Sequence, residues 1–275
     1  MENGQDPELD NENNDKDHKT EANGSDDVLL CPGPNADYPA DVDRYISAEV
    51  RAQYDVYSYR HAAAILANSF PEELKEIEAA LLAFRITKRD LGTPSGNESD
   101  IPKRFSRTLR PAGWVESRIQ GDLIVRLQEY DEQVLSDGKV QKVKRPDTQS
   151  QLIEAFTDRH KIDYVKGGVA FDFEWNSTKE NFDRDLHAFR AFHEFGLISA
   201  VVIVTRSDKL NAVLNKVPQF NKAGDETAET VRAKYGVSTT WMNQLLNRLN
   251  AGLHEGCPVL VLGITPKLIE YWEQT

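Results

Sequence analysis

Cysteine and long apolar runs are the two features that this 275-residue sequence has least of. Its two cysteines, Cys31 and Cys257, lie far apart and form no CxxC pair, which excludes a disulfide framework and a zinc knuckle. No run approaches the roughly eighteen apolar residues of a membrane span, and the first residues lack the basic-then-apolar pattern of a signal peptide. These absences predict a protein of the reducing cytoplasm, without a membrane partner.

Nucleotide-binding fingerprints and internal repeats are absent as well. The glycine pair Gly167-Gly168 has neither the spacing nor the following helix of a phosphate-binding loop. We therefore expect no nucleotide cofactor.

The net charge of −12 is unevenly distributed along the chain. Residues 1–27 contain ten Asp or Glu and two Lys, and they have too few apolar residues to bury a core. We therefore predict a disordered acidic tail over residues 1–28 and a single domain over residues 29–275. Because the rest of the chain is close to neutral, the charge does not exclude a nucleic-acid partner for a local basic groove.

The apolar pattern predicts an α/β domain in which a mixed β-sheet is flanked by helices. Two continuous apolar runs, Ser199–Thr205 and Pro258–Ile264, are typical of buried strands, and Asn181–Phe192 has the pattern of an amphipathic helix. Further helices are expected from Tyr59, from Ser69 to Phe84, over residues 149–158 and 238–253, and at the C-terminus as far as Trp272.

Local signals refine this outline. Ser69 and Glu72 fit a capping box, with Pro71 in the first helical turn. Residues 28–58 and 87–111 are predicted to be loops, whereas residues 136–147 form a Lys-rich hairpin or loop after a strand at Leu123–Leu127.

One stretch combines strand alternation with clustered acids. Two short strands, Ile162–Lys166 and Val169–Asn176, meet at the Gly167-Gly168 turn. One face of the second strand carries Val169, Phe171, Phe173 and Trp175, and the other carries Asp172, Glu174 and Asn176. Asp163 on the first strand is able to approach these acids. Because clustered carboxylates repel each other unless a cation neutralises them, we predict a divalent-metal site.

The spacing of Asp163, Asp172 and Glu174 is typical of metal-dependent phosphodiesterases. In such a site two carboxylates bind Mg²⁺, and the third residue positions or deprotonates the attacking water. That third residue is usually Lys in nucleases and is Glu174 here. Two alternatives stay open: the acids could protect a sheet-edge strand from association, or Glu174 and Asn176 could be the second acid and the third residue.

The same stretch, with its Trp175-Asn176 ending, resembles the catalytic segment of BglII-type type II restriction endonucleases, including the BstYI-like enzymes, a branch of the PD-(D/E)xK nucleases. Three further stretches are similar to that family, namely Tyr59–Leu66, Val202–Arg206 and Val259–Ile264. The resemblance implies a restriction-endonuclease-like fold. It also implies Mg²⁺-dependent cleavage of double-stranded DNA by a homodimer, at short palindromes with a GATC core.

Carried over by position, the resemblance makes Asp163 and Asp172 metal ligands and the carbonyl of Phe173 a further ligand. Glu174 takes the variable third position, as a ligand or as the base. Asp172 stands where Glu is usual, and its side chain is one methylene shorter. This departure leaves an alternative function open, a DNA-binding protein of the same fold with impaired catalysis.

Polar residues that follow the catalytic strand are candidate DNA contacts: Asn176, Ser177, Lys179 and Arg184. Arg184 and Asp185 would also suit an ordinary ion pair on a helix surface, and Trp175 is predicted to belong to the core. A basic stretch over residues 103–110 has the composition of a phosphate-contacting segment.

Overall fold

The structure is a computed structural model that describes residues 33, 35–93, 100–157, 160–221, 223–234 and 239–270. These residues belong to one compact unit, Pro32–Thr275. The acidic tail predicted over residues 1–28 lies outside the described residues.

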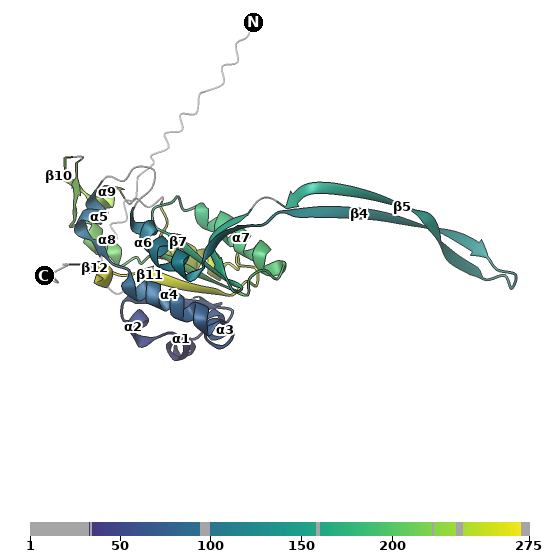
Figure 1. Ribbon diagram of the computed structural model, residues 1–275, viewed down its shortest axis with the longest axis horizontal. Helices are drawn as coiled ribbons and strands as arrows, with labels where there is room; N and C mark the ends of the chain where they lie inside the picture. The colour runs from purple at the N-terminus through teal and green to yellow at the C-terminus, as the bar shows by residue number, and fades with distance from the viewer. Residues whose placement is uncertain are drawn as a thin grey trace, which may run out of the picture. The chain divides into compact units, whose positions relative to one another are not determined.

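A six-stranded mixed sheet forms the centre of the fold (Figure 1). Its strands are, in spatial order, β1 (Tyr54–Tyr59), β11 (Val259–Ile264), β8 (Ala200–Arg206), β7 (Val169–Glu174), β6 (Lys161–Lys166) and β3 (Val115–Arg118). β7, β8 and β11 run parallel to one another, and the other pairs are antiparallel. Every residue of β8 and β11 is buried, so the two continuous apolar runs are interior strands as predicted.

Helices cover both faces of the sheet. Val202 and Val204 of β8 join a core cluster with residues of α3 (Ala62–Ser69), α4 (Pro71–Ala83) and α6 (Asp100–Leu109). Val201 and Ile203 alternate with them, face the opposite side and are equally buried. That second face carries α7 (Asn181–Glu194) and α10 (Met242–Asn250). The predicted α/β class, a mixed sheet flanked by helices, is confirmed.

Shorter elements complete the described chain. They are α1 (Pro39–Tyr45), α2 (Ala48–Arg51), α5 (Lys88–Gly92), η1 (Arg110–Ala112), α8 (Leu210–Leu214), α9 (Val231–Lys234) and η2 (Pro266–Leu268), with the strand pairs β2 (Ile86–Thr87) and β12 (Ile269–Glu270), and β9 (Pro218–Phe220) and β10 (Glu226–Thr230). None of the helices in the described ranges is long and apolar enough to cross a membrane.

A long hairpin of β4 (Gly121–Val134) and β5 (Val140–Thr157) forms a sheet of its own (Figure 1). The helix predicted over residues 149–158 is therefore wrong, since its described residues lie in β5. Leu152, Ile153 and Phe156 fit one helical face, but Leu152 and Ile153 pair across the hairpin with Ile124 and Leu123. Periodicity alone does not separate helix from strand over so short a run.

The N-terminal helices begin later than predicted. Tyr59 ends β1, and α3 starts at Ala62, because Arg60 and His61 turn the chain with φ of 56° and 60°. Ser69 closes α3 and no side chain caps α4, so the capping box is wrong, although Pro71 does occupy the first turn.

Three other stretches differ from their predictions. Residues 35–59 hold α1, α2 and β1 and are not simply a loop, and residues 87–111 contain α5 and α6. At the C-terminus, η2 and β12 replace the predicted helix, whose last residues lie outside the described chain.

Candidate active site

The acidic hairpin forms as predicted and lies inside the sheet. Gly167 and Gly168 join β6 to β7 with φ of 57° and 91°, a left-handed turn that favours glycine at both positions. β7 pairs with β6 on one side and with β8 on the other. It is therefore not an edge strand, and the interpretation of its acids as protection for an exposed edge is wrong.

Three carboxylates converge on the face of β7 that α7 covers. Asp172 and Glu174 come from β7, and Asp185 comes from the first half of α7. Each side chain offers an oxygen that lies within 4.8 Å of the other two, and each residue is only 7% exposed. Among the described residues, this is the group of His, Cys, Asp and Glu side chains arranged to hold a metal ion.

Burial and mutual repulsion oppose ionisation of this cluster. Burial raises the pKa of Asp172 well above its usual range, and the nearby charge of Asp185 raises it further. Burial, followed by the charge of Asp185, raises the pKa of Glu174 to about 8. The pKa of Asp185 is also raised by burial, although the Arg184 guanidinium acts in the opposite direction. At neutral pH the cluster therefore favours a bound proton or a bound cation.

Hydrogen bonds within the described chain leave part of the cluster without donors. The buried oxygens Glu174 Oε2 and Asp185 Oδ2 accept no hydrogen bond from a described group. By contrast, Asp172 Oδ1 accepts one from the Phe173 amide at 3.0 Å, and Asp185 Oδ1 accepts from Arg184 Nη2 at 3.0 Å. Unpaired buried carboxylate oxygens are costly, and an all-oxygen set suits a hard divalent cation. The residues present fit a metal site.

Asp163 lies at the margin of the cluster. Val165 and Ala170 are cross-strand partners, so Asp163 and Asp172 point to the same face of the sheet. The Asp163 side chain is 50% exposed, however, and its carboxylate pairs with Lys161 Nζ at 3.1 Å. Its charge still contributes to the raised pKa of Asp172.

Asp185 is the site residue that sequence reasoning missed, because its pairing with Arg184 suggested a helix-surface ion pair. A signal was available in the pattern of α7. Asp185 stands between Phe182 and Phe189 on the buried stripe of α7, where an acidic side chain is out of place.

The residues predicted to contact DNA follow β7 in the chain, in the loop to α7 and in the first turn of that helix. Asn176 and Lys179 are exposed in the loop that leads to α7, and the Arg184 side chain is mostly exposed. Ser177 is half-buried and donates a hydrogen bond that lowers the pKa of Glu174. Asn176 thus stands outside the strand, which supports Asp172 and Glu174 as the paired acids.

Other residues near the hairpin have structural roles. Phe173 packs against Phe84 and Phe105, and Trp175 is buried in the same core, as predicted. Lys166 donates to Glu76 at 2.6 Å and to the carbonyl of Ala112 at 2.8 Å, which ties β6 to α4.

The basic stretch over residues 103–110 also contributes to the core. Arg104 donates to Asp90 and to the carbonyl of Arg85, and Arg110 lies over the ring of Tyr164 at 4.5 Å. The Arg104 contacts hold α6 in place, whereas phosphate contacts by this stretch stay a prediction.

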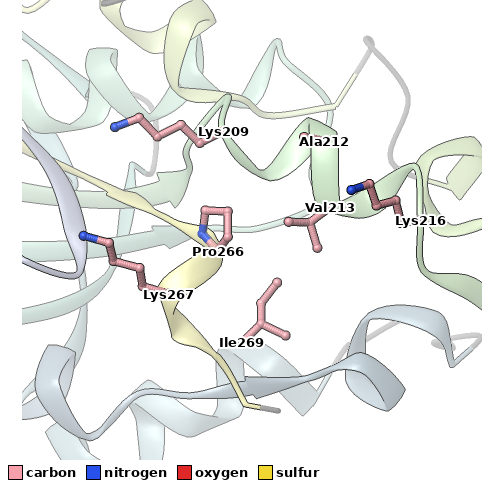
Figure 2. A pocket seen from close by; sticks show the side chains of 7 residues that line it. All are labelled: Lys209, Ala212, Val213, Lys216, Pro266, Lys267 and Ile269. Carbon is pink, nitrogen blue, oxygen red and sulfur yellow. The ribbon is translucent and has the colours of Figure 1, made fainter. Parts of the chain in front are cut away.

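A separate cavity of about 420 Å³ opens beyond the ends of β8 and β11 (Figure 2). Its lining residues are Lys209, Ala212, Val213, Lys216, Pro266, Lys267 and Ile269. Lys209 Nζ pairs with Asp55 at 2.7 Å, and Lys267 Nζ donates to the carbonyl of Ala52 at 2.8 Å. None of the three clustered carboxylates lines this cavity, so it is distinct from the candidate metal site.

Comparison with known protein families identifies the fold. The model of the family described as restriction endonuclease BglII/BglIII matches residues 54–264. That span runs from the first residue of β1 to the last residue of β11, and it includes all three clustered carboxylates. A search of curated proteins found no match. Members of the matched family are type II site-specific deoxyribonucleases that act on double-stranded DNA. The chain therefore belongs to the BglII/BglIII family of restriction endonucleases.

Proposed function

We propose that this restriction endonuclease depends on Mg²⁺ and hydrolyses phosphodiester bonds of double-stranded DNA as a homodimer, at a short palindrome with a GATC-type core. The observation that carries the proposal is the buried cluster of Asp172, Glu174 and Asp185, with its raised pKa values and its two oxygens without donors. Such perturbed acids concentrate at functional sites. Hydrolysis by water needs no nucleotide cofactor.

Asp172, Glu174 and Asp185 would hold the metal, with Asp163 and the carbonyl of Phe173 as further candidate ligands. Mg²⁺, when bound, supplies positive charge that offsets the carboxylates and the negative charge that develops on the phosphate. The side chain of Asp172 is shorter than the usual Glu. Asp185 would compensate for this, because α7 supplies a third carboxylate oxygen within 4.8 Å of the other two.

Glu174 is the residue that we assign to orient and deprotonate the attacking water. Its Oε2 has no hydrogen-bond donor among the described residues, so it is able to accept a hydrogen bond from that water. The water attacks phosphorus, the bond to the leaving oxygen breaks, and the Glu174 carboxylate is placed to take the proton. Asn176, Ser177, Lys179 and Arg184 would contact the DNA around this point, mainly at backbone phosphates.

A DNA-binding protein with impaired catalysis is the second candidate. Two observations favour it: Glu174 stands where nucleases usually have Lys, and Asp172 is shorter than the usual Glu. The two functions differ in one measurable respect, because only the first predicts cleavage.

The test is digestion of a plasmid that contains GATC sequences, with Mg²⁺ or with a chelator, by the wild type and by Asp185→Asn. Because the substitution removes one charge and no volume, we expect cleavage to fall at least roughly 100-fold while binding of the uncut duplex is retained. Sequencing of the cut ends reports the recognition site. DNA binding by the wild type without any Mg²⁺-dependent cutting would favour the second candidate.

Asp183→Asn is the matched control on the same helix. Asp183 is half-exposed and pairs with Arg248 at 2.7 Å, away from the cluster. We expect it to cleave like the wild type, since an exposed ion pair contributes little. Equal cleavage by Asp185→Asn and Asp183→Asn would contradict the role assigned to Asp185.

A further inference from the structure

An arginine is fully buried beside the candidate active site. Arg206 is the last residue of β8, and its exposed fraction is 0%. The residue before it, Thr205, is the cross-strand partner of Glu174, so Arg206 lies at the same end of the sheet as the carboxylate cluster. Removing a guanidinium from water is costly, so the groups that surround Arg206 must offset that cost.

Two tryptophan rings contact the Arg206 guanidinium. Its central carbon lies 4.2 Å from the centroid of the Trp241 ring and 5.8 Å from that of Trp175. A cation close to an aromatic ring is attracted by the ring, and more strongly so when both are shielded from water. Trp175 directly follows β7 and Trp241 directly precedes α10, so the arginine joins two segments that are far apart in the sequence.

Hydrogen bonds attach the segment before α10 to the same guanidinium. Arg206 Nε and Nη2 donate to the carbonyl of Thr240 at 3.0 and 2.6 Å, and Nη2 also donates to Thr239 Oγ1 at 2.6 Å. Several donors in a rigid planar fork are a property of arginine that lysine lacks. The position of residues 239–240 therefore depends on Arg206.

The same two residues hold the loop that follows β7. Thr240 donates its backbone N–H to the Ser177 carbonyl at 2.9 Å, and Thr178 forms an antiparallel bridge with Thr239. The Ser177 side chain in turn donates a hydrogen bond to Glu174. The contacts of the buried arginine thus extend, through two backbone segments, to the glutamate that we assign to the attacking water.

We propose that Arg206 is a positioning residue, which holds the loop of residues 175–180 against Glu174 and in the place from which the loop contacts DNA. The inference rests on the proposed function, because three of the predicted DNA contacts, Asn176, Ser177 and Lys179, belong to this loop. Arg206 is not part of the carboxylate cluster. Its loss is therefore expected to release the loop and to leave the three acids in place.

Hydrogen exchange in the free protein, without metal or DNA, tests whether Arg206 holds the two segments together. Arg206→Met retains an unbranched side chain between the tryptophans and removes the donors. We expect the Thr240 amide to exchange at least roughly tenfold faster than in the wild type, while the amides of β8 stay protected, because exchange reports local opening. Unchanged exchange at Thr240 would overturn the inference.

Single-turnover cleavage tests the consequence for the reaction. At saturating duplex with Mg²⁺, well below both melting temperatures, we expect the rate constant of Arg206→Met to fall at least about tenfold, since small misplacements of reacting groups are costly. Affinity for the uncut duplex in chelator is expected to fall at least roughly threefold, because the loop is no longer preorganised. A lower melting temperature with wild-type rate and affinity would identify a purely structural residue and overturn the inference.

Arg248→Met is the matched control. Arg248 is also mostly buried and also lies over an aromatic ring, that of Phe182 at 5.9 Å, but its guanidinium pairs with Asp183. We expect this variant to cleave and bind like the wild type, since its ion-pair partner is half-exposed. Equal losses in Arg206→Met and Arg248→Met would contradict a specific role for Arg206.

Thr239→Val keeps the inference testable if Arg206→Met does not fold. It removes only the hydroxyl that accepts from Arg206. The loss of one hydrogen bond is expected to change exchange at Thr240 and the cleavage rate in the same directions by about threefold each. Wild-type behaviour of Thr239→Val would then overturn the inference.

The positioning role and the nuclease function fail in distinguishable ways. Normal cleavage and duplex affinity in Arg206→Met, with faster exchange at Thr240, leave the nuclease function in place and overturn the positioning role. A wild type that binds DNA without cutting overturns the nuclease function instead. In that case equal duplex affinities of the wild type and Arg206→Met overturn the positioning role as well, whereas a weaker affinity of the variant supports it.

Discussion

At the scale of single residues, the raised pKa of Glu174 couples the candidate metal site to the stability of the fold. An exposed glutamate ionises at its ordinary pKa of 4.5, whereas Glu174 in the folded chain retains its proton up to about pH 8. The folded state therefore binds the proton more tightly than the unfolded state does. The resulting stability is complete below pH 4.5 and is lost as the pH rises through 8.

We expect Glu174→Gln to stabilise the metal-free protein at pH 9 and to have little effect at pH 5. The amide cannot ionise, so it avoids a penalty on the order of 5 kcal/mol that the wild type incurs at high pH, since the pKa is raised from 4.5 to about 8. Thermal unfolding of both proteins in chelator, over this pH range, measures the difference. A constant difference in melting temperature from pH 5 to pH 9 would contradict the assigned pKa.

The other two acids of the cluster depend on the same environment. Their repulsion is a cost that the free protein retains, because Asp172, Glu174 and Asp185 lie close together with little solvent between them. Repulsion between carboxylates is common in sites that bind cations, since the positive charge of the bound ion offsets it. The proposed metal site thus accounts for the position of Asp185 on a buried helical stripe.

At the scale of elements, α10 approaches the sheet closely at Gly263, where a larger residue would force a neighbouring side chain to shift. A Cβ on Gly263 of β11 would lie 2.4 Å from Met242 Sδ and 3.2 Å from the Ser207 Cβ. Met242 is the first residue of α10, so this glycine sets how closely the helix approaches the strands beside the candidate site.

We predict that Gly263→Ala lowers the free energy of unfolding by about 2 kcal/mol, because overpacking a buried contact forces neighbouring side chains to shift. The matched background is Met242→Ala, which removes the clashing thioether. In that background Gly263→Ala is expected to cost little, and urea denaturation of the four proteins measures the coupling. Equal costs in both backgrounds would show that Met242 is not the source of the strain.

Several elements followed directly from local sequence signals. The strands over residues 162–166 and 169–174, the glycine turn between them and the helix from Asn181 were predicted because alternation, the glycine pair and helical periodicity agree there. The strand β5 and the C-terminal segment were not predicted correctly, since helices were expected there. Their short apolar runs fit helix and strand equally, and pairing with β4 and β2 decides between them.

At the scale of the whole molecule, the proposed boundary between an acidic tail and a folded domain stays a prediction. Its basis is composition, because residues 1–27 hold ten acids and almost no apolar side chains. The described core, by contrast, draws on residues from Val42 to Ile269.

We expect deletion of residues 1–28 to leave the melting temperature and the proposed dimer unchanged, because a segment of this composition has almost no apolar side chains to bury. Differential scanning calorimetry and sedimentation of the shortened chain measure both quantities. If the deletion increases DNA affinity at low salt, the tail competes with DNA for a basic groove; unchanged affinity would identify it as a solubilising segment.

The sequence by itself determined the α/β class, the interior strands and the two acids of β7. These features depend on local alternation and on continuous apolar runs, which a single segment already contains. Tertiary structure alone decided that Asp185 joins Asp172 and Glu174, that Asp163 stays half-exposed beside Lys161, and that residues 149–157 pair with β4. Each of these depends on which distant segment lies beside the residue in the folded chain. The pKa of a side chain and the pairing of a strand are set by such tertiary contacts and not by the local sequence. The acidic hairpin could therefore be located from its own residues, but the third carboxylate that completes the candidate metal site comes from the way α7 packs on the sheet.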